Sequence, residues 1–197
     1  MSSKYLALGD SYTIGEQVPL FENFPYQLIQ LLRKKYPEQQ WLAPEIVAKT
    51  GWTTDELLQH LDQTVLLQHY ELVTLLIGVN NQYRGRSIEN YREEYEVLLQ
   101  KAIAFAGGDI NSVLVISIPD WGTTPFAEGR DRHQIAIEID QYNNACKQIT
   151  EAAGVRFIDI TGSQRTDAYD LSFVAGDGLH PSGKEYAKWA SKVVNVW

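Results

Sequence analysis

The chain is poor in sulfur, since its 197 residues contain one cysteine and one methionine. A single cysteine, Cys146, cannot form an intramolecular disulfide and cannot supply the thiolate cluster of a structural zinc site. Because the residues around it follow helical spacing, Cys146 is interpreted as a small buried side chain. The sequence therefore excludes a fold that depends on disulfides or on a thiolate-bound metal.

Positive charge is also scarce, with 17 Lys and Arg residues against 25 Asp and Glu residues and a formal net charge of -8. Nucleic acids and anionic membrane surfaces attract proteins through basic patches. The one basic run, Arg33-Lys34-Lys35, is short, and we expect it at the solvated carboxyl end of a helix. We therefore expect no nucleic acid and no membrane surface as a partner.

Long apolar runs are missing, because no apolar stretch has the length needed to span a membrane. The amino terminus enters its first apolar segment directly, without the cleavage site of a secretory signal. These features predict a cytoplasmic protein that does not insert into membranes. They leave open whether a leader was removed.

Short apolar segments rich in β-branched residues alternate with longer amphipathic segments along the whole chain. The continuous apolar character of LVTLLIG and VLVISIP is typical of strands that helices cover on both faces. Five strands are predicted in this way, at Tyr5–Leu8, Glu45–Ala48, Leu72–Ile77, Val113–Ile118 and Val155–Asp159.

The segments between the strands have helical periodicity. Apolar residues recur at steps of three and four over 88–105 and 135–153, and Gly154 is the predicted cap of the second of these helices. Another helix is predicted over Pro25–Tyr36. Two more helix starts have the spacing of capping boxes, formed by Thr53 with Glu56 and by Ser182 with Glu185.

Strands that alternate with helices imply right-handed crossovers and an open sheet. The predicted fold class is α/β, a three-layer α/β/α arrangement around a five-stranded parallel sheet. No repeat, low-complexity tract or linker divides residues 1–197, which are predicted to form a single domain. Ligands bind beyond the carboxyl ends of the strands in such sheets, so functional residues should directly follow strands.

Three predicted strands are followed by residues that suit a catalytic site. Gly9-Asp10-Ser11 ends the first strand, Gly51 follows the second and Asn80 follows the third. Taken one at a time, each is more simply explained as a turn residue. As site residues, Ser11 would be a nucleophile, Gly51 would offer its backbone amide, and Asn80 would direct its side-chain amide at developing negative charge.

Asp177 and His180 lie in the loop before the last predicted helix. Serine catalysis needs a base that takes the hydroxyl proton and a third group that orients this base. A carboxylate three residues before an imidazole can fold back onto the ring, which favours Asp177 over Asp167 and Asp170. The remaining histidines fall in or near predicted helices, where surface positions are expected: His60, His69 and His133.

Two other interpretations of the same loop lack necessary parts. Residues 178–184 have the spacing of a phosphate-binding loop, but Glu185 stands where Ser or Thr must hold magnesium. Asp177 and His180 could form half of a metal site, yet no second histidine and carboxylate complete it. No metal site is predicted.

The four groups together resemble the SGNH hydrolases, also called GDSL esterases and lipases. Ser11 in Gly-Asp-Ser, Gly51, Asn80 in Gly-Val-Asn, and Asp177 with His180 in Asp-Gly-Leu-His occur in the order of that family's four sequence blocks, and the match spans residues 9–180. The resemblance implies a flavodoxin-like fold. It also implies a serine esterase that hydrolyses a carboxylic ester through an acyl-enzyme, with neither metal nor organic cofactor.

The resemblance also implies a role for each matching residue. Ser11 corresponds to the nucleophile, His180 to the general base and later acid, and Asp177 to the group that orients His180. The backbone amides of Ser11 and Gly51, with the Asn80 side chain, correspond to the oxyanion hole. The chain departs from the family pattern at Asn81, where many members have Asp, and in a minor way at Tyr12, where the family name implies Leu.

Aromatic residues near these positions are candidates for an acyl or alcohol pocket, although packing under the loops explains them equally well. A long apolar lid of the kind expected for bulk lipid is absent from the sequence, so a short acyl group on a small-molecule ester is expected. The candidates for the pocket are Trp52, Tyr83, Trp121 and Phe126.

Two rival functions use the same residues. A non-catalytic flavodoxin-like module could bind a polar ligand through Ser11, Asn80 and Asp177, but it would not need His180 as a base. An acyltransferase could use the same triad and would differ only in the acceptor of the acyl group. The sequence does not separate transfer from hydrolysis, and it does not decide the oligomeric state.

Overall fold

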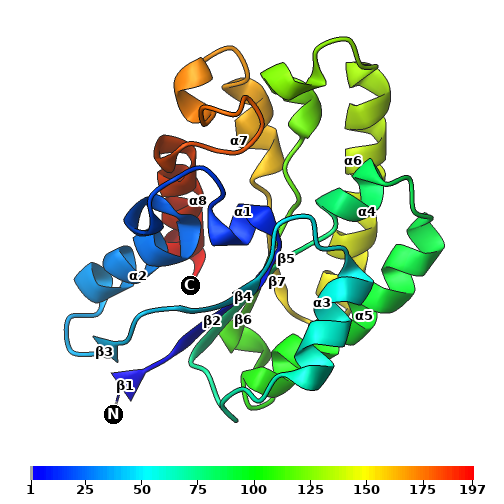
Figure 1. The fold of residues 1–197 in the computed structure, drawn as a ribbon. Helices are drawn as coiled ribbons and strands as arrows, with labels where there is room; N and C mark the ends of the chain where they lie inside the picture. The colour runs from blue at the N-terminus through cyan, green and yellow to red at the C-terminus, as the bar shows by residue number, and fades with distance from the viewer. Residues whose placement is uncertain (1) are drawn as a thin grey trace.

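The computed structural model describes residues 2–197 and has a parallel sheet at its centre (Figure 1). The strand order is β4-β2-β5-β6-β7. The strands are β2 (Tyr5–Gly9), β4 (Glu45–Ala48), β5 (Leu72–Leu76), β6 (Val113–Ile116) and β7 (Arg156–Ile158). Every predicted strand is therefore confirmed, with small differences at the ends, and so is the α/β fold class.

A second sheet was not predicted from the sequence. It consists of β1 (Ser2–Ser3) and β3 (Gln40–Trp41), which pair in parallel. Strands of two residues are too short to show an alternation of apolar and polar residues, which is the signal that sequence prediction uses.

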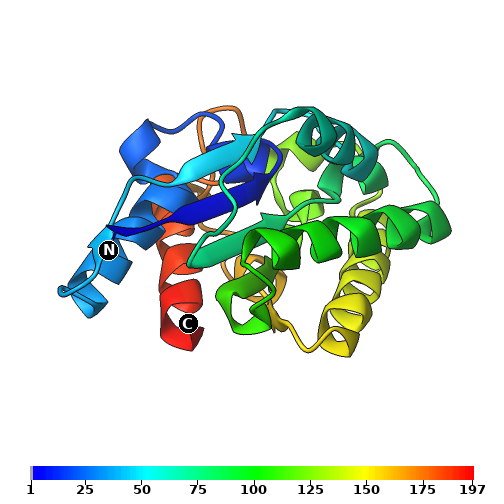
Figure 2. The same cartoon turned by 90° about the horizontal axis from the view of Figure 1, so that it is seen from below.

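Helices cover both faces of the sheet. Helices α2 and α8 pack together on one face, and α3, α5 and α6 lie on the other (Figures 1 and 2). The helices are α1 (Ser11–Ile14), α2 (Phe24–Lys35), α3 (Thr54–Gln63), α4 (Val79–Tyr83), α5 (Ile88–Phe105), α6 (Arg132–Ala152), α7 (Thr161–Thr166) and α8 (Gly183–Val196). This arrangement confirms the three predicted layers.

The core lies between the sheet and each helical layer. All residues of β2, β5 and β6 are buried, as their continuous apolar character predicts. The apolar stripe of α5 packs against this sheet through Tyr91, Tyr95, Leu98, Leu99 and Ala102. Cys146 is buried on α6, as expected. Across residues 2–197, every helix is too short or too polar to cross a membrane.

The predicted helix ends are confirmed with one exception. The capping box of Thr53 and Glu56 is present at the start of α3, and Gly154 follows the end of α6 in a left-handed conformation. The basic run 33–35 forms the last turn of α2. The capping box predicted at the start of α8 is wrong, for the reason given next.

Ser182 does precede α8, but its hydroxyl donates a hydrogen bond to the Ser172 carbonyl at 2.7 Å. Glu185 is almost fully buried and accepts from Trp189 Nε1 at 2.8 Å and from Lys188 at 3.0 Å. Other partners thus occupy both side chains that would have formed the box: a preceding loop carbonyl for Ser182, and two side chains of α8 itself for Glu185.

Candidate active site

The sheet topology explains why distant parts of the chain meet. β2 lies between β4 and β5, so its following loop emerges between the loops of its two neighbours. This is the point at which the strand order reverses, where doubly wound folds place their ligands. The loops after β2, β4 and β5 carry Ser11, Gly51 and Asn80, which all line one pocket.

Close packing at the end of β2, just before Ser11, requires a glycine at position 9. A Cβ atom on Gly9 would lie 2.1 Å from Thr13 Oγ1 and 2.4 Å from the Leu76 carbonyl oxygen of β5. Asp10 then caps α1, because its carboxylate accepts a hydrogen bond from the Tyr12 amide at 3.0 Å. Ser11 is the first residue of this short helix.

Ser11, His180 and Asp177 form a continuous hydrogen-bonded relay. The Ser11 Oγ atom lies 3.0 Å from His180 Nε2, and His180 Nδ1 lies 2.6 Å from Asp177 Oδ2. Ser11 and His180 are buried, and the carboxylate of Asp177 remains partly exposed. A neutral imidazole in this position can accept the serine proton while the carboxylate fixes the ring.

Backbone amides hold the Asp177 carboxylate in place. Asp177 Oδ1 accepts hydrogen bonds from the amides of Leu179 and His180, each at 3.0 Å. Burial alone would raise the pKa of Asp177, but the hydrogen bonds from His180 and from these two amides outweigh it and lower the pKa. The acid of the relay therefore stays ionised near neutral pH.

The other two acidic candidates are engaged elsewhere. Asp167 pairs with Lys188, and Asp170 pairs with Lys184 at 3.2 Å. His60, His69 and His133 are exposed, as expected. Within residues 2–197, no group of three or more histidine, cysteine and carboxylate side chains is placed to hold a metal ion.

Two backbone amides at the pocket are unpaired. Neither the Ser11 nor the Gly51 amide donates a hydrogen bond within the part of the chain that the structure describes. Gly51 has a φ of +83°, and its carbonyl accepts a hydrogen bond from Arg84 at 2.6 Å. The two amides are thus available to a ligand, as an oxyanion hole requires.

The Asn80 side chain is less free than the sequence suggests. Its Nδ2 atom donates to the Trp52 carbonyl at 3.0 Å and lies 3.3 Å from Asp10 Oδ2. The second contact is long for a hydrogen bond to a carboxylate, so it is weak. A developing oxyanion in the pocket would compete with this contact for one Asn80 proton.

Asp10 is fully buried beside Ser11. Burial raises the pKa of its carboxyl group to about 7, and the hydrogen bonds from the Tyr12 amide and from Asn80 oppose this rise. Asp10 therefore titrates near neutrality and is in contact with a proposed oxyanion donor. Sequence analysis gave Asp10 no role, because burial cannot be read from a turn residue.

Asn81 links the site to α3 and α5. It is fully buried, its Oδ1 atom accepts from the Thr54 amide at 3.1 Å, and its Nδ2 atom donates to Thr54 Oγ1 at 2.6 Å. The Thr54 hydroxyl in turn donates to Glu94. An amide at position 81 supplies the proton that leaves Thr54 free to bond Glu94, which explains how this chain accommodates Asn where many family members have Asp.

Three of the four predicted aromatic residues line the pocket. Tyr83, Trp121 and Phe126 form part of the pocket wall. The volume of the pocket is about 140 Å³. Trp52 lies outside this pocket, with its ring centroid 4.8 Å from that of His60. The lining residues that sequence analysis did not propose are Tyr12, Thr50, Val79 and Leu179. Tyr12 could have been suggested, because it directly follows Ser11, the candidate nucleophile.

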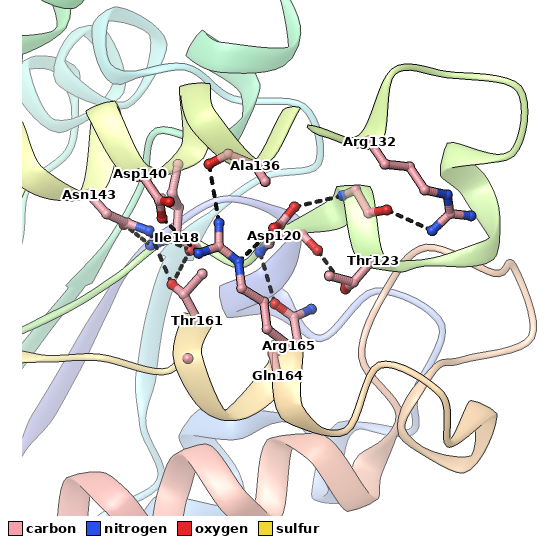
Figure 3. A network of polar contacts seen from close by, with 12 residues as sticks. Ile118, Asp120, Thr123, Arg132, Ala136, Asp140, Asn143, Thr161, Gln164 and Arg165 are labelled. Carbon is pink, nitrogen blue, oxygen red and sulfur yellow. Dashed lines mark hydrogen bonds and ion pairs between the residues drawn. The ribbon is translucent and has the colours of Figure 1, made fainter. Parts of the chain in front are cut away.

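A network of polar contacts fixes the loop that carries Trp121 (Figure 3). Arg165 donates to Asp120 Oδ2 and to Asp140 Oδ1, each at 2.8 Å, and Asp120 Oδ1 accepts from the Gly122 amide at 2.9 Å. The Arg132 guanidinium donates to the Gly122 carbonyl at 2.7 Å. The Trp121 ring is held from the other side, since its Nε1 donates to Gln82 Oε1 at 2.7 Å.

Residues 7–188 match the sequence profile of the GDSL-like Lipase/Acylhydrolase family. An acetylxylan esterase of Geobacillus stearothermophilus is 26% identical over 91% of this chain and 86% of its own length. The spore germination lipase LipC of Bacillus licheniformis is 24% identical over 98% of this chain and 95% of its own. The crystal structure of a lipase/acylhydrolase from Enterococcus faecalis superposes with a TM-score of 0.73, at 21% identity, over 98% of this chain and 94% of the other.

Proposed function

Because this chain belongs to the GDSL-like lipase/acylhydrolase family, and is thus a serine hydrolase acting on ester bonds, we propose that it cleaves a small carboxylic ester with a Ser11–His180–Asp177 triad. The family match confirms the resemblance seen in the four sequence blocks. The hydrogen-bonded relay from Ser11 Oγ through the His180 ring to Asp177 is the observation that carries the proposal.

The first half of the proposed reaction transfers the acyl group to the enzyme. Ser11 Oγ attacks the ester carbonyl carbon while His180 Nε2 takes the serine proton, and the carbonyl oxygen becomes an oxyanion. His180 then gives this proton to the departing alkoxide as the carbon–oxygen bond of the ester breaks. The alcohol leaves and the acyl group remains on Ser11.

The second half releases the acid. A water molecule attacks the acyl carbon, His180 takes one of its protons, and the bond to Ser11 Oγ breaks as His180 returns a proton to the serine. Asp177 stays ionised and stabilises the imidazolium that forms in each half. We propose that the Ser11 and Gly51 amides, with Asn80, donate hydrogen bonds to both oxyanions.

A short acyl group is supported by the size of the pocket. About 140 Å³ is well below the volume that drug-sized ligands fill. Tyr83, Trp121 and Phe126 would close the pocket around a group of a few carbons. The acetylxylan esterase among the relatives is consistent with an acetyl ester as substrate.

A fluorophosphonate probe tests the proposal without knowledge of the substrate. Intact-mass analysis and peptide mapping should find one adduct on Ser11 in the wild type and none in folded His180→Ala. His133→Ala, which alters an exposed histidine on α6, is the matched control and should be labelled like the wild type. A folded wild type that is not labelled would contradict the proposed function and favour a non-catalytic binding module.

A further inference from the structure

The three aromatic rings of the pocket wall form one cluster. The ring centroids of Tyr83 and Trp121 are 5.3 Å apart, those of Trp121 and Phe126 are 5.9 Å apart, and those of Tyr83 and Phe126 are 6.3 Å apart. These are contact distances for aromatic pairs. The cluster presents one side to the Ser11 pocket, and Tyr83 and Phe126 also reach solvent.

Arg130 lies against all three rings. Its guanidinium carbon is 5.5 Å from the centroid of Tyr83, 5.6 Å from that of Trp121 and 5.8 Å from that of Phe126. A guanidinium within about 6 Å of a ring is attracted to the negative face of the ring. The aromatic cluster therefore holds this cation beside the catalytic pocket.

The hydrogen-bond donors of Arg130 are mostly unused. Its side chain makes one long contact, 3.4 Å from Nη2 to the Tyr83 hydroxyl, and it enters no ion pair among residues 2–197. Arg130 is exposed to solvent. Attraction to ring faces consumes none of the hydrogen-bond acceptors that a guanidinium needs, so its N–H groups can still bind a second group.

Nearby arginines show what a structural role looks like in this molecule. Arg165 donates from each of its three nitrogens, to Asp120, Asp140 and the Ala136 carbonyl, and Arg132 donates to the Gly122 carbonyl (Figure 3). Both side chains fix the loop between β6 and α6. Arg130 belongs to the same loop but fixes no carbonyl or carboxylate within the described residues.

The charge of Arg130 contrasts with the charge of the whole chain. A protein with a net charge of -8 repels anions at long range, so an anionic ligand needs a local cation. A planar guanidinium with a free edge binds a carboxylate through two parallel hydrogen bonds. Such a bond, beside an aromatic wall, suits a molecule that places a carboxylate just outside the pocket.

We propose that Arg130 and the aromatic cluster form a subsite for a carboxylate carried by the ester substrate. The short acyl group fills the pocket, and the carboxylate reaches the guanidinium beyond the rings. Arg130 would then determine specificity without taking part in bond making or breaking. This inference rests on the proposed function, because it describes the substrate of the same site.

Matched substrate pairs test the subsite. 4-Acetoxybenzoate and 4-acetoxybenzamide differ in a carboxylate on the alcohol side, and mono(4-nitrophenyl) glutarate and its methyl ester differ on the acyl side. In at least one pair, kcat/KM of the wild type should be about tenfold higher for the carboxylate, and Arg130→Gln should remove this ratio. Arg130→Lys keeps the positive charge but cannot form the two parallel hydrogen bonds of a guanidinium, and should retain part of the ratio.

Controls separate the subsite from general charge effects. Arg92→Gln removes a positive charge on α5, where Arg92 bonds Gln148 of α6, and should leave both ratios unchanged. Raising the salt concentration to 0.5 M should shrink the wild-type ratio, because salt screens exposed charges. Ratios near one in the wild type, or ratios that persist in Arg130→Gln, would overturn the subsite.

Calorimetric binding of 4-hydroxybenzoate and 4-hydroxybenzamide gives a readout that does not depend on catalysis. The carboxylate should bind the wild type about tenfold more tightly, and Arg130→Gln should bind the two equally. Equal binding to the wild type would rule out a carboxylate on the alcohol side, and together with a kinetic ratio near one for the acyl-side pair it would overturn the subsite even if Ser11 is labelled by the fluorophosphonate. A wild type that prefers the carboxylate but is not labelled would instead overturn only the esterase mechanism.

Discussion

The two sides of the Ser11 hydroxyl differ in how completely their hydrogen bonds are formed. On the base side, His180 already contacts both Ser11 and Asp177, and two amides fix the carboxylate. On the proposed oxyanion side, the Ser11 and Gly51 amides have no acceptor among the described residues, while Asn80 donates to the Trp52 carbonyl and makes a weak contact with Asp10. The proposed proton relay is thus assembled before a substrate binds, whereas two of the three proposed oxyanion donors, the Ser11 and Gly51 amides, gain a partner only when the oxyanion forms.

The neighbouring residues Asn80 and Asn81 also differ in how completely the hydrogen bonds of their side-chain amides are formed. Asn81 is fully buried and bonds Thr54 with both ends of its amide, while Asn80 lines the pocket and shares its protons between two acceptors. One amide holds the helix start, and the other faces the ligand. Equal chemistry at adjacent positions therefore serves structure in one case and, as proposed, catalysis in the other.

The largest loss of activity should come from removing Ser11 or His180. Ser11→Ala and His180→Ala should each lower kcat by about 10⁶-fold, and the double variant should lose little more, because the two groups act as one unit. Steady-state kinetics on a chromogenic acetate ester measures all three variants. Losses that multiply in the double variant would contradict a shared relay.

Removing a proposed oxyanion donor should lower kcat less than removing Ser11 or His180. Asn80→Ala should reduce kcat by about 10²- to 10³-fold with little change in KM, because the donor acts on charge that develops in the transition state. The same kinetic assay measures this loss. An unchanged kcat would remove Asn80 from the oxyanion hole and leave the two amides as its donors.

Asp10 should make the stability of the protein depend on pH. Its pKa in the folded state is about 7, above the ordinary value of 3.8, so between pH 4 and 7 the folded chain binds a proton that the unfolded chain has released. The Asp10 contribution to the free energy of unfolding should therefore fall over this range, by up to about 4 kcal/mol, and stay constant above it. Urea unfolding of the wild type at several pH values measures the slope.

Asp10→Asn is the matched variant for this slope. It cannot ionise, so its stability relative to the wild type should rise between pH 4 and 7 and then level off. Its amide would also place a donor against Asn80 Nδ2, so kcat should fall even where the variant is stable. A difference in stability that does not vary with pH would show that Asp10 does not titrate near neutrality.

The smallest effect is expected at Asn81. Asn81→Asp would leave two carboxylates, at positions 81 and 94, competing for the single proton of the Thr54 hydroxyl, and should cost about 1 to 3 kcal/mol of stability. Glu94→Gln in the same chain should recover most of this loss. A double-mutant cycle by urea unfolding gives the coupling, and two losses that simply add would contradict the proposed contact.

The sequence could predict which residues gather at the pocket, because their grouping follows from the topology of the sheet. Ser11, Gly51 and Asn80 each follow a strand closely, and strand ends could be predicted from apolar runs bounded by turn residues. Which partner each side chain contacts could not be predicted, even where the partner is near in the chain. Glu185 turned to Trp189 instead of forming a capping box, and the Trp52 ring packed on His60 instead of lining the pocket.

Arg130 shows a second limit. In the sequence it is one more charged residue in a polar loop, and its position depends on three rings brought together from α4 and from the loop after β6. Similarly, the pKa of Asp10 depends on burial under elements that follow much later in the chain. Local pattern predicts elements and their ends, but not the contacts between side chains.

One backbone hydrogen bond joins the loop that carries Phe126, in the pocket wall, to the loop that carries His180. The Phe126 amide donates to the Gly178 carbonyl at 2.9 Å, between Asp177 and His180 in one loop and the aromatic cluster in the other. This hydrogen bond couples the two loops, because they cannot separate at this point without breaking it. The exchange of a single amide proton for deuterium reports how often the active site opens, and a bound inhibitor that keeps the loops closed would slow that exchange.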